Sequence, residues 1–294
     1  MIRLDAATVL LQWATGGLLF LWVTTRRRQV GIGYGWLLRS IYLVMALGAL
    51  ATGRLTGRSV PMRDVAAAGV VLAAGFALAV SIVRRKAGVA GERARQERRA
   101  ARVAAMTGTE RHADAPDPDA PDPDADAPEF PPALDVIAPV IGAVGLVAAG
   151  WASASGGAHF LGIVRTLTGA AFLGAVTDAM LLGHWYLVQP GLGRGPLEEL
   201  NGWVARVWPI EVAALLWPVG MVSVLNGSID DGYGGILGWF WVACALATII
   251  LCGVTRAALK ERAYSAVMAA TGLLYLAILT AFGTDLVARA ILAG

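Results

Sequence analysis

Three ionisable residues lie inside one long apolar segment of this chain. The segment runs from about residue 161 to 188 and contains Arg165, Asp178 and His184. A stretch of this length and apolarity is typical of a membrane-spanning helix. An ionisable group inside a bilayer costs several kcal/mol unless it is paired or faces a polar cavity. Each of the three residues is therefore a candidate for proton transfer or for binding a polar group.

A second apolar segment, 203–225, carries Arg206 and Glu211 and follows a short turn rich in Pro and Gly. Counted from this turn, Asp178 lies about ten residues deep and Glu211 about eight, so the two carboxyl groups are predicted to meet. Two carboxylates this close would not both ionise, and one should keep its proton. His184 and Arg206 lie nearer the turn. The sequence thus predicts an inner cluster of Asp178, His184, Arg206 and Glu211, with the two carboxyl groups and His184 transferring protons.

A second polar cluster is predicted at the other end of the same helix. Asp285 and Arg289 are four residues apart on the last apolar segment and hence lie on one helical face, at a depth similar to that of Arg165. His159 should lie just beyond them. This outer cluster of Arg165, Asp285 and Arg289 suits a proton path or a pocket for a polar headgroup. Alternatively, its ion pairs only fix the register of the helices.

The cofactor stays open at this level, and a quinone is one candidate that the inner residues could bind. His184 and Tyr186 are placed to hydrogen-bond the quinone carbonyls, with Trp185 and Arg206 beside the headgroup, while Asp178 or Glu211 exchanges the proton. Residues of this kind within one apolar hairpin predict a polar site reached from the bilayer.

Haem and metal sites are not predicted. Of the three histidines, His112 lies in a polar loop, and His159 and His184 lie near opposite ends of one segment, so no two can ligate the same b-haem. Metal-binding spacings such as HxxxH and ExxH are missing. Cys244 and Cys252 are eight residues apart on one helix, about 12 Å, which is too far for a disulfide. Without a CxxC motif, they are interpreted as packing residues.

The composition indicates a membrane protein with many crossings. Of the 294 residues, 57% are hydrophobic and 15% are charged, and the mean hydropathy is +0.63. Soluble domains carry about a quarter charged residues. The fold class predicted is all-α, a polytopic bundle of about eight transmembrane helices, and no role with nucleic acid is expected. The apolar segments run about 6–24, 36–53, 64–83, 134–151, 161–188, 203–225, 235–254 and 264–292.

One long polar stretch divides these segments. The predicted organisation is a three-helix group over 1–83, a loop over 84–132 and a five-helix group over 133–294. The first half of the loop is basic. The second half repeats Ala, Pro and Asp, a composition that predicts disorder.

The basic residues predict the orientation. Eight crossings place three basic clusters on one side, which the positive-inside rule makes cytoplasmic. Both termini would then be external, in the cytoplasmic membrane of a bacterium. Arg54, Arg58 and Arg63 fall on the external side and conflict with this scheme. The three clusters are Arg26–Arg28, Arg84–Lys86, and Arg256 with Lys260 and Arg262.

The run Thr177–Leu192, TDAMLLGHWYLVQPGL, resembles a signature of uncharacterised bacterial multi-pass membrane proteins, and Ala270–Tyr275, ATGLLY, is similar to a second run of that group. The resemblance implies that Gly183, His184, Trp185, Tyr186 and Pro190 are important, and it names no activity. The helix count is also similar to that of the quinol-oxidising anchor subunits of the dimethyl sulfoxide reductase type. That likeness is one of architecture, without the sequence pattern of that family.

Three functions remain open at this level. The first is an integral membrane subunit of a redox or respiratory assembly, with a quinone or proton site and other membrane or redox subunits as partners. The second is a proton-coupled transporter that titrates Asp178 and Glu211. Pro209 and Pro218 would break the helix near Glu211, as in the broken helices of transporters, although the sequence has no evident inverted repeat. The third is a structural scaffold. Whether the chain is itself an enzyme stays open.

Overall fold

A computed structural model gives the fold. It describes residues 5–27, 29–56, 60–84, 130–154, 158–189, 192–218, 220–261 and 263–292. The predicted polar loop therefore lies almost wholly outside the described residues. So do Arg28, Arg58, Arg85, Lys86, His112, Pro190 and Arg262.

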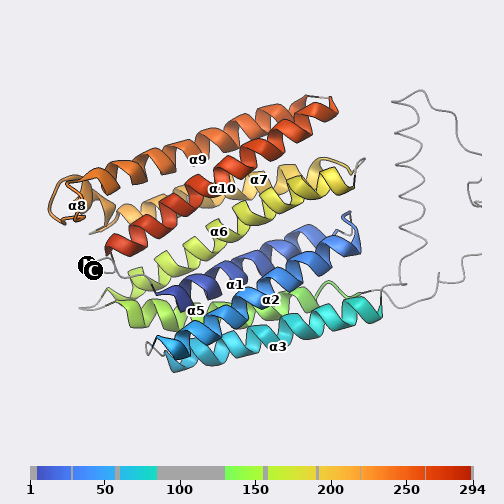
Figure 1. The fold of residues 1–294 in the computed structure, drawn as a ribbon, viewed down its shortest axis with the longest axis horizontal. Helices are drawn as coiled ribbons and strands as arrows, with labels where there is room; N and C mark the ends of the chain where they lie inside the picture. The colour runs from blue at the N-terminus through green and yellow to red at the C-terminus, as the bar shows by residue number, and fades with distance from the viewer. Residues whose placement is uncertain are drawn as a thin grey trace, which may run out of the picture.

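The described residues form one bundle of antiparallel helices (Figure 1). Successive long helices run in opposite directions. Asp5 and the end of α10 lie at the same end of the bundle, here called the terminal end, and the opposite end, beside residues 84 and 130, is called the loop end. The helices are α1 (Ala6–Thr25), α2 (Ile32–Leu55), α3 (Pro61–Val83), α5 (Leu134–Ser153), α6 (His159–Val188), α7 (Gly195–Leu216), α8 (Met221–Leu225), α9 (Ile236–Lys260) and α10 (Tyr264–Leu292).

The chain is an all-α, multi-pass membrane helix bundle, as predicted. Seven of the described helices are long and apolar enough to cross a membrane, namely α1, α2, α3, α5, α6, α9 and α10. The eighth long helix, α7, packs against α6 and α9 but carries Glu198, Glu199, Arg206 and Glu211, which make it more polar. Large apolar side chains cover the outer surface of the bundle, including Leu72, Trp239 and Leu279, as a lipid environment requires.

The boundaries of α7 differ from the predicted segment 203–225. The helix begins eight residues earlier, at Gly195, because Pro196 in its first turn is compatible with a helix start. It ends at Leu216, just before Pro218, which lacks the N–H needed to continue the helix. The predicted single segment is therefore α7, a break and the short α8.

The centre of the bundle is the crossing of α1 and α6. A Cβ added at Gly16 would lie 1.8 Å from the carbonyl oxygen of Ala170, and one added at Gly174 would lie 2.1 Å from the carbonyl carbon of Gly16. The two backbones are therefore in direct contact, which only residues without side chains allow. Trp13 fastens the same pair of helices, since its indole N–H donates to the Thr177 hydroxyl at 2.9 Å.

Gly17, next along α1, makes room for an aromatic ring from α2. A Cβ at Gly17 would lie 2.0 Å from Cζ of Tyr42, so the ring of Tyr42 lies directly against the α1 backbone. Tyr42 is completely buried and its hydroxyl points onward to α6. The packing of α1 thus determines which polar groups reach α6.

A compact loop at the terminal end starts α9. The carboxylate of Asp231 accepts hydrogen bonds from the backbone N–H groups of Gly235, Tyr233 and Leu237, each at 2.9 Å. These bonds hold the pKa of Asp231 below its usual range, and the bond from Gly235 has the largest effect. The ionised side chain therefore satisfies N–H groups at the helix start that have no partner within the helix.

Gly16→Val tests the importance of the α1–α6 crossing. The added side chain must push the two backbones apart, and overpacking a filled interior costs about 1–3 kcal/mol or more. We expect a clearly lower unfolding temperature in detergent, measured by intrinsic tryptophan fluorescence. Gly272→Val on α10 is the matched control, because a Cβ at Gly272 meets open space. Equal unfolding temperatures for the two variants would contradict this description of the core.

Candidate functional site

Some buried charges in the bundle are fully paired and have a structural explanation. Arg39 on α2 and Asp135 on α5 are almost inaccessible, and Nε and Nη2 of Arg39 bond the two carboxylate oxygens at 2.8 and 2.7 Å. Thr25 donates to the same carboxylate at 3.2 Å, and the guanidinium lies 4.4 Å from the centre of the Phe130 ring. Such a two-point pair fixes the register of α1, α2 and α5 at the loop end.

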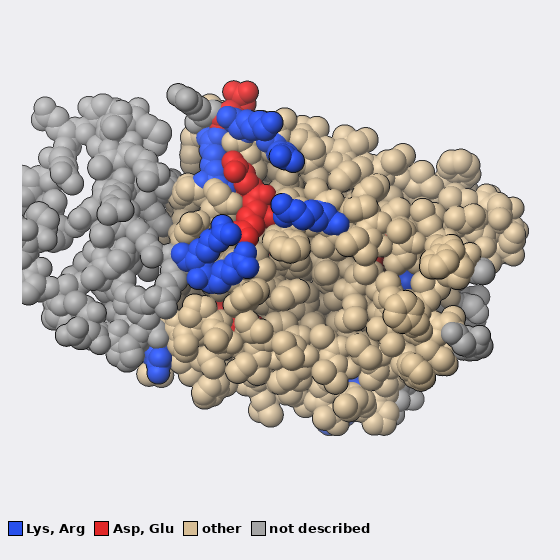
Figure 2. Space-filling view, turned by 180° about the vertical axis from the view of Figure 1, so that it is seen from behind, with Lys and Arg blue, Asp and Glu red and all other residues tan. Residues whose placement is uncertain are grey.

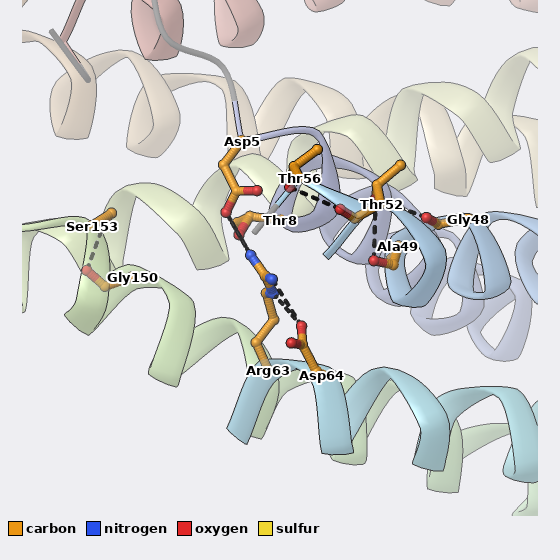
Figure 3. A network of polar contacts seen from close by, with 10 residues as sticks. All are labelled: Asp5, Thr8, Gly48, Ala49, Thr52, Thr56, Arg63, Asp64, Gly150 and Ser153. Atoms are coloured by element: carbon orange, nitrogen blue, oxygen red, sulfur yellow. Dashed lines mark hydrogen bonds and ion pairs between the residues drawn. The ribbon is translucent and has the colours of Figure 1, made fainter. Parts of the chain in front are cut away.

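Arg63 is paired in the same way at the terminal end (Figure 3). Its guanidinium donates to Asp5 Oδ2 at 2.6 Å and to Asp64 Oδ1 at 2.8 and 2.9 Å, and Thr8 also bonds Asp5. Arg63 is only 1% exposed. In the predicted orientation Arg63 is one of the positive charges that fall on the external side. Because two carboxylates neutralise it within the bundle, it contributes little to the charge of that side.

Glu211 on α7 is different, because its burial is complete and its carboxyl group lacks donors. Neither carboxyl oxygen of Glu211 has a hydrogen-bond donor in the part of the chain that the structure describes. The polar groups that interact with it include Asp285 and Arg289 on α10 and Thr168 on α6. The Thr168 hydroxyl hydrogen is already donated to Val164 O at 2.9 Å. Glu211 thus lies beside a second carboxyl group, and that group, Asp285, also has one oxygen, Oδ2, without a donor among the described residues.

Arg289 supports the other side of this carboxyl pair. Its Nε donates to Asp285 Oδ1 at 2.7 Å and its Nη2 donates to the carbonyl oxygen of Arg165 at 2.6 Å. The side-chain oxygen of Gln12 on α1 faces two donors when its amide is turned to exchange the oxygen and nitrogen positions. In that orientation the oxygen accepts from Arg289 Nη2 at 2.7 Å and from Ala170 N at 3.1 Å. One guanidinium therefore links α10 to both α1 and α6. Gly169 allows this approach, since a Cβ there would overlap Gln12, Arg289 and Asp285.

Arg165 contributes a second cation, but its guanidinium is directed at backbone carbonyls. Its Nε donates to Ala214 O at 2.9 Å and its Nη2 to Trp217 O at 3.4 Å. These carbonyls belong to the last turn of α7 and to the break after it, where no helical N–H can reach them. The positive charge of Arg165 thus stabilises the broken end of α7.

A polar cavity leads from the terminal end to these arginines. Its volume is about 280 Å³, and Arg165 and Arg289 form part of its wall, as do Asp5, Thr8 and Ser153. A larger, apolar groove of about 850 Å³ lies beside it between α6 and α7, lined by residues that include Leu161, Pro209 and Trp217. The polar cavity therefore reaches Arg289, the ion-pair partner of Asp285, and the apolar groove lies next to it; Glu211 and Asp285 themselves are not among the residues that line either one.

Asp178 lies in a separate polar group nearer the middle of the bundle. The hydroxyl of Tyr42 donates to Asp178 Oδ1, and the hydroxyl of Tyr34 donates to the Asp178 carbonyl oxygen at 3.3 Å. The residue is completely buried, and its Oδ2 finds no donor within the described ranges. Tyr34 and Tyr42 are eight residues apart on one face of α2 and are both inaccessible.

The structure does not bring the predicted inner cluster together. Asp178 is ten residues from the loop end of α6, about 15 Å, whereas Glu211 is sixteen residues from the start of α7, about 24 Å. The earlier start of α7 causes this difference. Glu211 consequently joins Asp285 and Arg289, which with Arg165 were predicted to form the outer cluster.

The residues predicted to hold a quinone headgroup also lie apart. His184 is exposed on α6 and its Nδ1 lies 3.2 Å from the hydroxyl of Tyr275 on α10. Tyr186 is buried and donates to Gly193 O, and Trp185 donates to Gln189 at 2.9 Å. Arg206 is exposed on α7, 5.5 Å from the ring centre of Trp203. His159, at the terminal end, stacks on Trp151.

The carboxyl pair of Glu211 and Asp285, with Arg289 and the polar cavity, is thus the candidate site. No protein-family model, curated protein sequence or solved structure matches this chain. The resemblance of Thr177–Leu192 to a membrane-protein signature stays a prediction. Within the described ranges, no group of three His, Cys, Asp or Glu side chains is placed to hold a metal ion.

Several site residues were not singled out from the sequence. Gln12 and Arg39 are polar residues inside apolar segments, and that position alone is a signal that could have identified them. Tyr34 and Tyr42 were harder to recognise, because tyrosines in membrane helices usually lie at the interfaces. Only the position of Gly17 opposite Tyr42 explains why the Tyr42 ring turns inward.

Arg39 and Asp135 offer a test of the division between structural and functional charges. Arg39→Met leaves a buried carboxylate without a cation to neutralise it, and we expect it to destabilise the protein by about 3–5 kcal/mol. The double variant Arg39→Met/Asp135→Leu removes both charges and should recover most of that loss. The measurement is thermal unfolding in detergent. A double variant as unstable as the single one would show that the pair has more than a structural role.

Proposed function

We propose that this protein is a proton-coupled membrane transporter in which Glu211 and Asp285 bind and release the coupling proton. The observation that carries the proposal is the pair of adjacent, fully buried carboxyl groups, three of whose four oxygens have no hydrogen-bond partner among the described residues. The paired charges of Arg39 and Arg63 have all the partners that burial requires. Glu211 lacks a hydrogen-bond donor among the described residues, and a proton bound to its carboxyl group removes the charge that needs one.

Charge balance supports this assignment. Arg289 neutralises Asp285 through a direct ion pair at 2.7 Å, and Arg165 directs its donors at the carbonyls of Ala214 and Trp217. A second bare carboxylate at Glu211 would face Asp285 in a medium of low dielectric constant, where like charges repel strongly. A proton on Glu211 removes that charge, and its O–H can donate to Asp285 Oδ2. One bound proton therefore neutralises Glu211 and supplies a donor to Asp285 Oδ2.

The same contacts suggest how a proton can drive a conformational change. When Glu211 releases its proton, two carboxylates compete for Arg289. A shift of the guanidinium toward Glu211 weakens its bonds to Gln12 and to Arg165 O, which tie α10 to α1 and α6. The protonation state of one residue on α7 is thereby linked to the packing of three other helices.

The proton route runs from the terminal end, where the polar cavity brings water to Arg165 and Arg289. Toward the loop end the next buried carboxyl group is Asp178, ten residues along α6 from Thr168 and therefore about 15 Å away. Its bond from Tyr42 gives it a hydroxyl partner through which a proton can be passed on. If the basic residues place the loop end in the cytoplasm, the polar cavity faces the external side.

A second candidate is a membrane subunit of a redox assembly that binds a quinone, and the apolar groove between α6 and α7 favours it. The groove includes Ala214, whose carbonyl oxygen is held by Arg165. A quinone ring entering from the bilayer would reach the neighbourhood of Arg165 and Glu211 there. This groove would be the quinone site in place of the one predicted around His184 and Tyr186.

Proton movement in proteoliposomes tests the proposal. Vesicles that contain a pH-sensitive dye receive a proton gradient, with and without a soluble small-molecule extract of the host cells. We expect the extract to accelerate proton entry through the wild-type protein, and Glu211→Gln to reduce entry to the level of empty vesicles. Glu198→Gln is the matched control, because Glu198 is an exposed carboxylate on the same helix.

The outcomes separate the candidates. If proton entry depends on Glu211 only when the vesicles contain a quinol, the redox-subunit hypothesis is favoured over the transporter. The scaffold interpretation requires Glu211→Gln to behave as the wild type does. Wild-type vesicles in which no proton movement depends on Glu211 would contradict the proposed function.

A further inference from the structure

A second site lies at the loop end of the bundle, away from the carboxyl pair. A cavity of about 540 Å³ opens there between α7 and α9, and three basic side chains, Arg206, Arg256 and Lys260, line it. The only acidic residue among its lining residues is Glu198. Figure 2 shows Lys and Arg gathered around a few acidic side chains at this end of one face, while the rest of the face is almost free of charge.

The basic side chains converge on the cavity from two helices. A Cβ at Gly202 would lie 3.4 Å from Nη1 of Arg206, so the guanidinium reaches back over Gly202 toward the loop end. Side chains of α-helices lean toward the helix N-terminus, and α7 and α9 are antiparallel. Arg206 on α7 and Arg256 on α9 consequently lean toward each other. Arg206 is further held by the Trp203 ring.

The floor of the cavity is apolar and contains an unsatisfied acceptor. Ile249, Cys252 and Gly253 of α9 face Ala205 and Asn201 of α7. Asn201 is 3% exposed and donates to the Cys252 carbonyl oxygen at 3.0 Å, but its own Oδ1 has no donor among the described residues. A ligand that fills this cavity therefore meets basic groups at the membrane boundary and an apolar wall below them.

We propose that this cavity binds an anionic phospholipid. Arg206, Arg256 and Lys260 hold its phosphodiester headgroup, and one acyl chain lies along Ile249 and Gly253. A Cβ at Gly253 meets open space, so the groove is vacant at the position where the acyl chain would run. Basic side chains at a membrane surface attract anionic lipids, and long basic side chains place their charged ends at the headgroup level.

The cavity favours a lipid over a free anion for a structural reason. A free phosphate needs only the basic side chains, and it would leave the apolar floor between α7 and α9 open to the bilayer. A lipid fills both parts. Apart from this cavity, the contact between α7 and α9 is closed at the loop end by Arg194, which donates to the carbonyl oxygens of Leu259, Glu261 and Ala263. The bound lipid would complete this helix pair. The site does not depend on the proposed proton chemistry.

Native mass spectrometry of the full chain in detergent tests this site. The delipidated protein is titrated with phosphatidylglycerol or with phosphatidylcholine, and the fraction carrying one lipid is measured. We expect phosphatidylglycerol to be retained preferentially. The double variant Arg256→Gln/Lys260→Gln should bind it about 25-fold more weakly, since each basic side chain near an anionic lipid contributes about fivefold in affinity.

Two further variants separate a defined site from general attraction of charge. Gly253→Leu keeps every charge but fills the groove, and we expect it to lose the preference as well. Arg84→Gln removes a basic residue at the loop end of α3, which does not line the cavity, and should bind as the wild type does. Circular dichroism and gel filtration establish that each variant is folded. A further measurement adds millimolar inorganic phosphate to the protein loaded with phosphatidylglycerol. If Gly253→Leu fails to fold, the double variant and this competition still decide whether the cavity binds the lipid.

Four results would overturn the proposal. Equal retention of the two lipids would show that the cavity does not recognise an anionic headgroup. Equal losses in Arg84→Gln and the double variant, or an unchanged affinity in a folded Gly253→Leu, would indicate that surface charge acts without a groove. Displacement of phosphatidylglycerol by millimolar inorganic phosphate would show that the basic side chains bind a free anion instead of a lipid.

Discussion

The direct contact between the backbones of α1 and α6 at Gly16 and Gly174 is the constraint on which the other polar contacts depend. It brings the first helix into the centre of the bundle, where a polar residue needs a partner. Gln12, one turn before Gly16, meets Arg289 and the backbone of Ala170 there. Gly17, one residue after it, accommodates the ring of Tyr42, whose hydroxyl bonds Asp178. A larger residue at either glycine would separate both polar groups from α6.

Within that packing, the buried charges fall into two kinds. Arg39 with Asp135, and Arg63 with Asp5 and Asp64, form complete pairs between neighbouring helices, which is what a charge away from water requires. Glu211 and Asp285 form an incomplete one. The break after α7 contributes to this, because the carbonyls of Ala214 and Trp217 accept hydrogen bonds from Nε and Nη2 of Arg165. Arg165 thereby stabilises the end of α7, while its charge still interacts with Glu211.

The sequence was sufficient for the helical class, the membrane environment and the approximate ranges of most helices, because apolar segments of about 20 residues are a strong signal. It also indicated that Asp285 and Arg289 share a face, since a spacing of four residues determines that directly. It failed for α7, where polar residues in the first two turns concealed the helix start at Gly195 and shifted the depth of Glu211. The directions of Tyr42 and Arg165 were not predictable either. Hydropathy gives the depth of a residue along a helix, but the partner helix determines where its side chain points.

The most direct test of the proposed proton site is the infrared spectrum of the protein in lipid at neutral pH, compared between the wild type and Glu211→Gln. A protonated carboxylic acid has a carbonyl stretching band that a carboxylate lacks, and a buried group exchanges slowly into deuterated water. The proposed site predicts that such a band is present in the wild type, is lost in Glu211→Gln and is retained in Glu198→Gln. Identical spectra for the wild type and Glu211→Gln would mean that Glu211 carries no proton, and the carboxyl pair could then not be the proton-binding site.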